Sequence, residues 1–192
     1  MSGLAAILLA GGRGSRMGGV NKPLLEVGGT TLLNAAIGAA EDAGCDSIVA
    51  VGDPLAGADA SPAVTWVRED PPFGGPAAAI LAALPLVAAS RVLVLACDLP
   101  EVRAAVPLLL ASPFEGDGAC LADEEGRLQW LAGIYRTDAL RSAGAGLPQA
   151  GQGASVRALL GELSITAVAA SDDLAADIDT WDDLNQARRR NP

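Results

Sequence analysis

Near its start, the sequence reads Leu4-Ala-Ala-Ile-Leu-Leu-Ala-Gly-Gly-Arg-Gly-Ser-Arg-Met-Gly-Gly-Val-Asn-Lys22. The apolar run from Leu4 to Ala10 has no polar alternation, which is typical of a strand covered on both faces. No cation precedes this run and glycines follow it at once, so we interpret it as a buried strand and not as a secretory signal. The glycine-rich segment then lies at the carboxyl end of that strand, where open α/β sheets bind ligands.

The rest of the chain alternates between short apolar runs and longer Ala/Leu-rich segments. We expect strands at 4–10, 47–51, 64–67, 92–96, 118–122, 128–135 and 165–169, and helices at 31–43, 76–88, 102–111, 155–163 and 180–190. This alternation predicts a three-layer α/β fold with helices on both faces of a sheet. A polar turn between 118–122 and 128–135 predicts a hairpin, so the sheet is expected to be mostly parallel but mixed. Residues 144–153, rich in glycine, are expected to form a loop.

Length and composition exclude several classes of protein. The 192 residues, 51% of them hydrophobic, fit a single domain, 1–192, with a sizeable core. A formal charge of −10 argues against binding to nucleic acid. The chain has no histidine, which removes imidazole as a general base and as a metal ligand. No apolar run is long enough for a membrane span, and Cys45, Cys97 and Cys120 are too scattered for a disulfide framework, so we expect a cytoplasmic protein.

The glycine-rich segment has the composition of a phosphate-binding loop. Residues 11–19 contain five glycines, whose backbone N–H groups can approach an anion closely. Arg13, Arg16 and Lys22 add positive charge, and Lys22 is the only lysine in the chain. A glycine-rich turn with solvated cations is the structural alternative.

Two familiar phosphate-binding motifs fit this segment less well. A Walker A motif needs Ser or Thr after its lysine, whereas Pro23 follows Lys22. Gly12, Gly14 and Gly18 give a GxGxxxG spacing, which keeps an NAD(P)-binding Rossmann oxidoreductase as an alternative. After Gly18, however, the chain is expected to turn at Asn21, Lys22 and Pro23 and not to run on into a helix.

Carboxylates follow at positions where strands end. Asp98 comes just after the expected strand 92–96, so it should lie at the same edge of the sheet as the glycine loop. A single Asp opposite phosphates suits Mg²⁺. A helix N-cap for the segment from Val102 is the alternative role for Asp98. Asp177 and Asp179, two residues apart, share one side of an extended stretch and are further candidate metal ligands. Asp70, in a proline-rich loop, is a candidate hydrogen-bond acceptor for a base or a ribose.

Together, these stretches resemble the molybdenum cofactor guanylyltransferases (MobA-like), nucleotidyltransferases with a glycosyltransferase-A-like, Rossmann-like fold. The resemblance rests on an ordered set of motifs that spans nearly the whole chain. They are the LAGG…RMGG…K loop from Leu9 to Lys22, Glu69-Asp70 with Gly75-Pro76, Cys97-Asp98-Leu99-Pro100, Gln129-Trp-Leu-Ala-Gly-Ile-Tyr-Arg136 and Asp177-Ile-Asp-Thr-Trp-Asp-Asp-Leu184.

The resemblance assigns roles to individual residues. It implies nucleotide binding by Leu9, Ala10, Gly11, Gly12, Gly14, Lys22, Asp53, Asp70 and Asp98. It implies Mg²⁺ binding by Asp98, with Asp177 or Asp179 completing the site, and catalysis by Lys22, Arg16 and Asp98. Ser155 and Arg157, just ahead of a helix, are our candidates for binding the acceptor, on composition and position alone.

The reaction implied is Mg²⁺-dependent transfer of GMP from GTP to the terminal phosphate of molybdopterin, with release of pyrophosphate. Transient contact with cofactor-insertion proteins or molybdoenzymes is a further expectation. Trp181 replaces the proline usual in relatives, and aspartates at 177 and 179 are also common in relatives that transfer cytidylyl. A cytidylyltransferase for the same cofactor, a 2-phospholactate guanylyltransferase and a nucleotide-binding regulator without turnover therefore stay open as alternatives.

Overall fold

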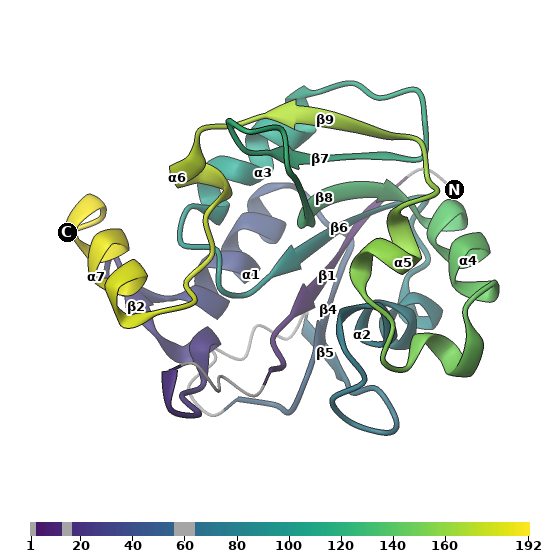
Figure 1. Cartoon of the computed structure of the whole chain (residues 1–192), viewed down its shortest axis with the longest axis horizontal. Helices are drawn as coiled ribbons and strands as arrows, with labels where there is room; N and C mark the ends of the chain where they lie inside the picture. Colours follow the sequence, from purple (N-terminus) through teal and green to yellow (C-terminus); the bar gives the residue numbers. More distant parts are fainter. Residues whose placement is uncertain (1–2, 13–16, 56–63) are drawn as a thin grey trace.

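The computed structural model describes residues 3–12, 17–55 and 64–192, and a seven-stranded sheet forms the centre of this described part (Figure 1). The strand order is β5-β4-β1-β6-β8-β7-β9. In that order the strands are Val64–Val67, Ser47–Val51, Leu4–Leu9, Arg91–Ala96, Leu128–Arg136, Gly118–Ala122 and Ile165–Ala169. The sequence-based bounds of β4, β5, β7 and β9 are therefore confirmed at both ends.

The direction of the strands brings the carboxyl ends of β5, β4, β1 and β6 and the start of β8 to one edge of the sheet. β5, β4, β1 and β6 run parallel, and Leu9 at the end of β1 pairs with Val51 of β4 and Ala96 of β6. β8 is antiparallel to both β6 and β7, so it begins at the edge where β6 ends. The expected mixed, mostly parallel sheet and the hairpin β7–β8 are confirmed, and β8 is the strand that runs against its neighbours.

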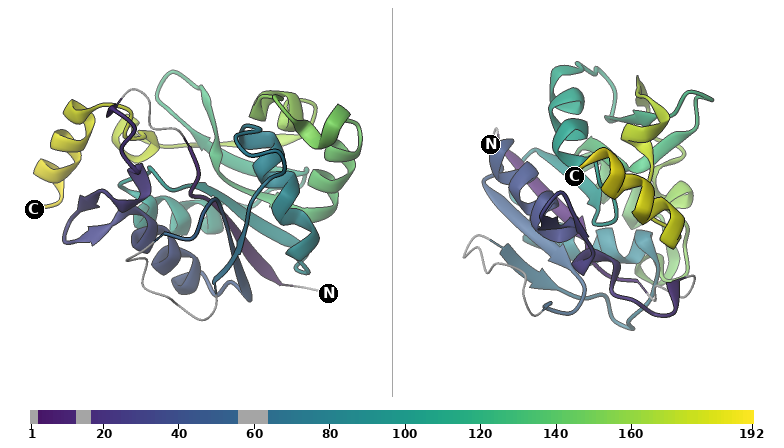
Figure 2. Two further views of the ribbon diagram at one scale, coloured as in Figure 1. Left: turned by 90° about the horizontal axis from the view of Figure 1, so that it is seen from below. Right: turned by 90° about the vertical axis from the view of Figure 1, so that its left-hand side faces the viewer.

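Helices cover both faces of the sheet, which confirms the three-layer fold (Figures 1 and 2). α1 (Leu32–Asp42) and α3 (Val102–Ala111) pack on one face. α2 (Pro76–Ala83), α4 (Thr137–Ala145) and α5 (Val156–Leu160) pack on the other.

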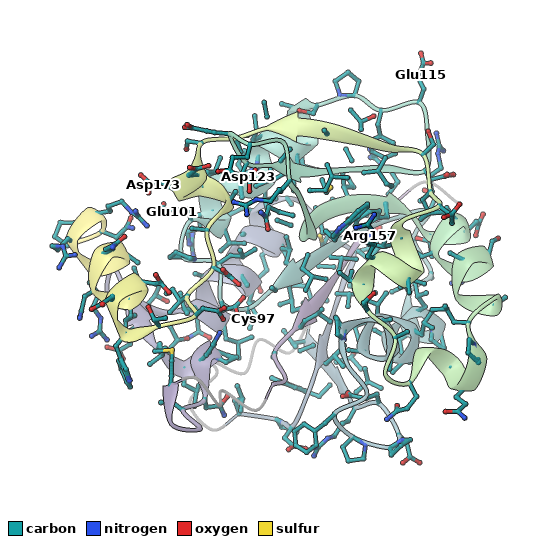
Figure 3. All side chains as sticks on the ribbon, in the orientation of Figure 1. Cys97, Glu101, Glu115, Asp123, Arg157 and Asp173 are labelled. Carbon is teal, nitrogen blue, oxygen red and sulfur yellow. The ribbon has the colours of Figure 1, made fainter. Side chains whose placement is uncertain are left out.

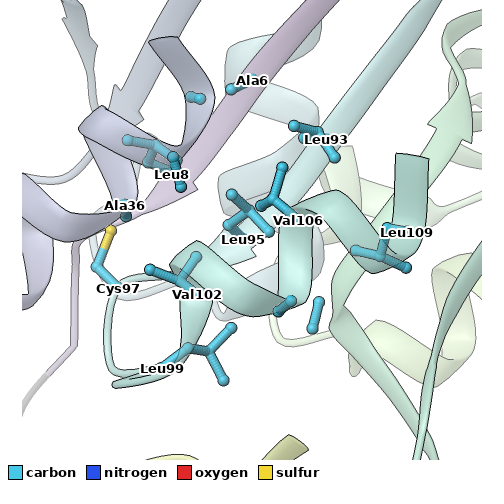
Figure 4. Packing of buried hydrophobic residues seen from close by; sticks show 14 of the residues in the cluster. Ala6, Leu8, Ala36, Leu93, Leu95, Cys97, Leu99, Val102, Val106 and Leu109 are labelled. Atoms are coloured by element: carbon cyan, nitrogen blue, oxygen red, sulfur yellow. The ribbon is translucent and has the colours of Figure 1, made fainter. Parts of the chain in front are cut away.

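Neighbouring residues of the central strands enter two different cores. Leu8 of β1 and Leu95 of β6 pack with Val102 and Val106 of α3 (Figure 4). Ile7, the neighbour of Leu8, packs instead with residues of α2 on the opposite face. Burial on both faces explains why the strand sequences lack polar alternation.

Three expected elements differ from the structure by more than one residue at an end. The helix expected at 76–88 ends at Ala83 and continues as a 3-10 turn, Leu84–Leu86, because Pro85 has no N–H to continue the α-helical ladder. The helix expected at 155–163 ends at Leu160, with Gly161 as its C-cap. The loop expected at 144–153 is shorter in the structure, because an unexpected helix, α4, extends to Ala145. A 3-10 turn at Pro148–Gly151 occupies most of the rest.

The segment that follows the glycine loop meets the C-terminal segment beside the sheet. The small sheet of β2 (Glu26–Val27) and β3 (Thr30–Thr31) lies next to the last helix, α7 (Trp181–Arg190), in both Figure 1 and Figure 2. A third core joins them, formed by Met17, Val27, Leu32, Ile178, Leu184 and Ala187. This core therefore holds the chain that follows the glycine loop against the C-terminal segment that carries Asp177 and Asp179.

The three cysteines are unpaired thiols, as expected. Cys97 and Cys120 are buried, and burial raises the pKa of the Cys120 thiol to about 11 and that of the half-buried Cys45 to about 12. These thiols are therefore protonated and unreactive at neutral pH. None of the helices in the described ranges combines the length and the apolar character that crossing a membrane requires.

Gly52, directly after β4, packs against the backbone of Ala10 and Gly11, directly after β1, and this contact generates a prediction about stability. Its φ is +145°, and a Cβ there would lie 3.1 Å from the Gly11 nitrogen. We expect Gly52→Ala to lower the free energy of unfolding by about 2 kcal/mol more than Gly44→Ala does. Gly44 is a matched control, because its φ is +72° and no atom lies within 4 Å of its added Cβ. Urea denaturation measures both; equal losses would contradict the prediction.

Candidate active site

The glycine loop begins where three strand ends are tied together. Ala10 N–H donates to the carbonyl of Val51 (3.0 Å), and Cys97 N–H donates to the carbonyl of Leu9 (3.1 Å). Gly11 and Gly12 follow with exposed backbone, and Gly12 has a φ of +149°. The predicted site residues Gly14 and Arg16 lie outside the described residues.

Lys22 reaches across the edge of the sheet to two carboxylates. It opens a short 3-10 turn, Lys22–Leu24, which is the chain reversal expected at Asn21, Lys22 and Pro23. Its Nζ lies 2.6 Å from Asp179 Oδ1 and 3.4 Å from Asp98 Oδ2. Only 17% of the Lys22 side chain is exposed, so this ammonium group is held inside the site and not on the surface.

A backbone hydrogen bond brings the C-terminal aspartates to Asp98. Ile178 N–H donates to the carbonyl of Asp98 at 3.0 Å, and the Ile178 side chain is buried in the core between the N-terminal loop and α7. Because side chains alternate along an extended stretch, Asp177 and Asp179 face the opposite way from Ile178. Carboxylate oxygens of Asp98, Asp177 and Asp179 lie within 4.8 Å of one another.

The charges of this cluster perturb one another. Burial raises the pKa of Asp98; the ammonium of Lys22 opposes that shift, while the nearby Asp177 and Asp179 add to it. For Lys22, burial acts to lower the pKa, but contacts with Asp179 and Asp98 outweigh it and raise the pKa above its usual value. Lys22 is therefore a permanent cation at neutral pH, and one cation faces three carboxylates.

The three carboxylates fit a hard divalent cation. Mg²⁺ takes oxygen ligands at about 2.1 Å, so oxygens that share one ion lie at most about 4.2 Å apart, close to the spacing found here. The alternative role of Asp98 as a helix cap is wrong, because α3 begins at Val102 with Glu101 as its N-cap. The cluster therefore supplies the type of ligand that a hard divalent cation prefers, at a spacing close to that around a bound ion.

A cleft of about 550 Å³ runs along this edge of the sheet. Of the predicted site residues, Leu9, Gly11, Gly12, Asp98 and Asp177 line it. Ala10 is buried beneath the loop, with 4% exposed, so it can offer the cleft only its backbone. The other described lining residues are Val51, Glu69, Phe73, Gly75, Pro76, Ala79, Ala96, Leu99, Leu128, Gln129, Trp130, Leu131, Ala132, Val156 and Ala175.

The predicted nucleoside contacts Asp53 and Asp70 do not line the cleft, but each follows a residue that does, Val51 or Glu69, within two positions of the chain, so both lie near its rim. Asp53 is exposed and forms an ion pair with Arg68. Asp70 is also exposed, and in this loop it is the neighbouring acid, Glu69, that lines the cleft. The Glu69 carboxylate accepts from the backbone N–H of Phe73 at 3.0 Å. Sequence reasoning missed Glu69, because the direction of each side chain in this loop depends on its folded path.

The predicted acceptor residues Ser155 and Arg157 flank the cleft. Ser155 Oγ accepts from the N–H of Ala158 at 3.1 Å and so caps α5. Arg157 is exposed on α5 (Figure 3), and Val156 between them lines the cleft. Sequence reasoning missed the larger contribution of β8, whose residues 128–132 form one wall of the cleft.

Comparison with known sequences identifies the family of this chain. A family model, the MobA-like NTP transferase domain, matches residues 6–187, which include the glycine loop and all three clustered aspartates. The chain belongs to this family. The MobA-like match confirms the resemblance found in the sequence.

Individual relatives share this relationship over part of their length. A molybdenum cofactor guanylyltransferase of Nitrobacter hamburgensis is 44% identical over 88 residues, which cover 44% of this chain and 41% of the relative. The chain spans about two fifths to two thirds of the length of the curated relatives that it matches.

Solved structures share the MobA-like fold over the whole chain. A nucleotidyl transferase from Methanothermobacter thermautotrophicus is 23% identical and covers 100% of this chain and 98% of its own, with a TM-score of 0.77. A Mycobacterium tuberculosis protein, Rv0371c, in complex with manganese is 18% identical and covers 98% and 99%, with a TM-score of 0.66. These likenesses confirm the nucleotidyltransferase type of Rossmann-like fold.

The carboxylate cluster predicts metal binding that depends on individual aspartates. We expect Asp98→Asn and Asp177→Asn each to weaken the binding of Mn²⁺ at least about tenfold, since even groups that only orient metal ligands commonly contribute that much. Titration followed by electron paramagnetic resonance measures the free Mn²⁺. Asp182→Asn is the control, because Asp182 is exposed in the first turn of α7 and outside the cluster. Equal affinity in Asp98→Asn and Asp182→Asn would contradict the assignment.

Proposed function

We propose that this protein transfers GMP from GTP to the terminal phosphate of molybdopterin and releases pyrophosphate, with Mg²⁺ as the metal. One observation carries the proposal: Lys22 meets a cluster of three aspartates near the glycine loop, and two of those aspartates, Asp98 and Asp177, line a cleft of about 550 Å³ together with Gly11 and Gly12. The name of the Nitrobacter relative supports the guanylyl donor and the cofactor acceptor.

The chemistry requires no general base. A phosphomonoester has a second pKa near ~6, so the acceptor phosphate is already largely ionised at neutral pH. It can attack the α-phosphate of the nucleotide directly, and pyrophosphate leaves. This explains how a chain without histidine can catalyse the reaction, because what remains is positioning and charge neutralisation.

In this proposal the residues of the cleft divide these tasks. Backbone N–H groups of Gly11 and Gly12, together with Gly14, hold the phosphates of the nucleotide. The ammonium of Lys22 neutralises charge that develops on the transferred phosphate, and we assign Arg16 a supporting role. The backbone of Leu9 and Ala10 meets the base, and Asp53 and Asp70 contact the nucleoside from the rim.

Asp98, Asp177 and Asp179 hold the cation. When bound, Mg²⁺ supplies positive charge that binds the triphosphate and stabilises the leaving pyrophosphate. The manganese in the mycobacterial neighbour supports a divalent cation in this fold. Lys22 contacts Asp179 and Asp98 directly, so the protein's own cation lies beside the position proposed for the metal.

Other acceptors and nucleotides fit parts of the same site. A cytidylyl transfer to the same cofactor uses the same phosphates and carboxylates, and so does a guanylyl transfer to 2-phospholactate. We place the reaction in the cytoplasm, because the three cysteines of the protein are free thiols, which suits a reducing compartment. Ser155 and Arg157 stay candidates for the acceptor side, and transient contact with cofactor-insertion proteins or molybdoenzymes is part of the proposal.

The proposal is tested by pyrophosphate release from each of the four NTPs with Mg²⁺, with and without molybdenum cofactor. We expect release with GTP only, and only when the cofactor is present. Release with CTP alone would replace guanylyl by cytidylyl transfer. No release from the folded protein with any of the four would reject this function and favour a binding protein, or an NAD(P)-dependent enzyme if NAD(P) binds without Mg²⁺.

Lys22 and Asp98 should carry large effects on turnover. We expect Lys22→Ala and Asp98→Ala each to lower kcat by about 10²–10³ or more, because each removes charge that stabilises the transferring phosphate or its counter-ion. Arg189→Ala is the control for loss of a cation, since Arg189 is exposed on α7. Steady-state kinetics measure the effect and circular dichroism checks the fold. Wild-type turnover in either variant would remove that residue from the mechanism.

A further inference from the structure

β8 departs from regular pairing where it borders the cleft. Cys120 of β7 pairs with Gly133 of β8, but the next residue of β7, Leu121, pairs with Gln129. Three residues of β8, 130–132, therefore have no counterpart on β7. Trp130 and Leu131 are neighbours, yet both pack on the α2 and α5 face of the sheet, as in a β-bulge.

A buried tyrosine fixes this bulge. Tyr135 has no exposed surface, and its hydroxyl donates to the carbonyl of Trp130 at 2.6 Å. Gly133 lies against the same hydroxyl, because a Cβ there would be 2.6 Å from it. A buried hydroxyl is costly to leave unpaired, so this hydrogen bond stabilises one conformation of residues 130–132.

The bulge presents an indole to the cleft. Trp130 is half-buried: it packs against the core beneath α2 and α5, and it lines the cleft that also contains Asp98 and Asp177. Its neighbour Gln129 lines the cleft as well, and the Gln129 amide donates to Asp123 at 3.3 Å. Asp123, labelled in Figure 3, also accepts from the N–H groups of Glu125 and Arg127, so the turn before β8 is ordered.

The cleft is therefore asymmetric about the aspartates. The glycine loop offers backbone groups that suit phosphates, whereas β8 offers the indole of Trp130 beside the amide of Gln129. The other aromatic side chain that lines the cleft, Phe73, lies in the exposed loop between β5 and α2 and not on β8. An indole suits a flat, polar heterocycle, because stacking buries much area with little loss of side-chain freedom. The terminal phosphate of such an acceptor must meet the nucleotide near Lys22 and Asp98, so its ring system is left to the β8 side.

We propose that Trp130 is an acceptor-binding residue that stacks on the pterin ring of the phosphorylated acceptor, and that Tyr135 is a positioning residue that holds Trp130 in place. This inference rests on the proposed function, because it identifies part of the acceptor site of the same reaction. Trp130 contributes to affinity for the acceptor and not for the nucleotide.

Binding is tested first with a stable probe, neopterin monophosphate, which carries a pterin and a phosphomonoester. In the variant Trp66→Phe/Trp181→Phe, Trp130 is the one remaining tryptophan of the three in the chain. With Mg²⁺ and a non-hydrolysable GTP analogue, we expect saturable quenching of its fluorescence. Equilibrium dialysis should show affinity lower by roughly ten- to hundredfold in Trp130→Leu. Equal affinity in Trp130→Leu and the wild type would overturn the inference.

Transfer kinetics provide the second readout. Trp130→Leu keeps an apolar side chain for packing but removes the flat ring, so we expect a KM for molybdopterin raised roughly ten- to hundredfold and a KM for GTP unchanged. Trp130→Phe should restore most of the loss, and Trp181→Leu, at an exposed tryptophan, should change neither constant. Tyr135→Phe removes only the hydroxyl and should raise the KM for the acceptor alone. A parallel rise in the KM for GTP in these variants would indicate a structural role and overturn the inference.

The outcomes separate this inference from the proposed function. Guanylyl transfer with a normal acceptor KM in Trp130→Leu would overturn the role of Trp130 and leave the function standing. No transfer by the wild type with any NTP would reject the function, and the neopterin monophosphate titration would still decide whether Trp130 binds a phosphorylated pterin.

Discussion

The hydrogen bond from Ile178 N–H to the Asp98 carbonyl joins two parts of the chain that are far apart in sequence, and the acidic site depends on it. The bond fixes the register of the C-terminal segment against the end of β6, and burial of the Ile178 side chain fixes which way the segment faces. With both fixed, alternation along an extended chain turns Asp177 and Asp179 toward Asp98. A shift of one residue would place the isoleucine in the site and the carboxylates in the core.

The helix that follows holds this segment at its far end. Thr180 and Asp183 form a reciprocal capping box at the start of α7, and Asp183 also accepts from the N–H of Asp179. At the end of α7, Arg190 forms an ion pair with Asp173 of α6 (Asp172–Ala175). The position of the acidic cluster is therefore set by a strand end and by a capped helix, while Lys22 offsets part of the repulsion among the three carboxylates.

The sequence was sufficient for the parts of the molecule that depend on local pattern. Strands buried on both faces appear as short apolar runs, and residues such as Asp98 and Lys22 are found because they follow those runs. It was insufficient where a distant residue decides. The bulge of β8 depends on Tyr135 and on the absence of a side chain at Gly133. Neither residue forms a local sequence pattern from which a bulge could be predicted. α4 was missed because it follows β8 with no turn residue between them.

The same distinction explains why the base of the nucleotide is harder to read than its phosphates. Phosphates are recognised by charge and by glycine, which are visible in sequence at Lys22 and at residues 11–19. In the proposed function the base meets the backbone of Leu9 and Ala10, and Ala10 is buried with its side chain away from the cleft. Backbone groups recognise a base through their position. Here the hydrogen bond from Ala10 N–H to the Val51 carbonyl sets that position. In the proposed function, discrimination between guanine and cytosine would depend on how β1 and β4 end.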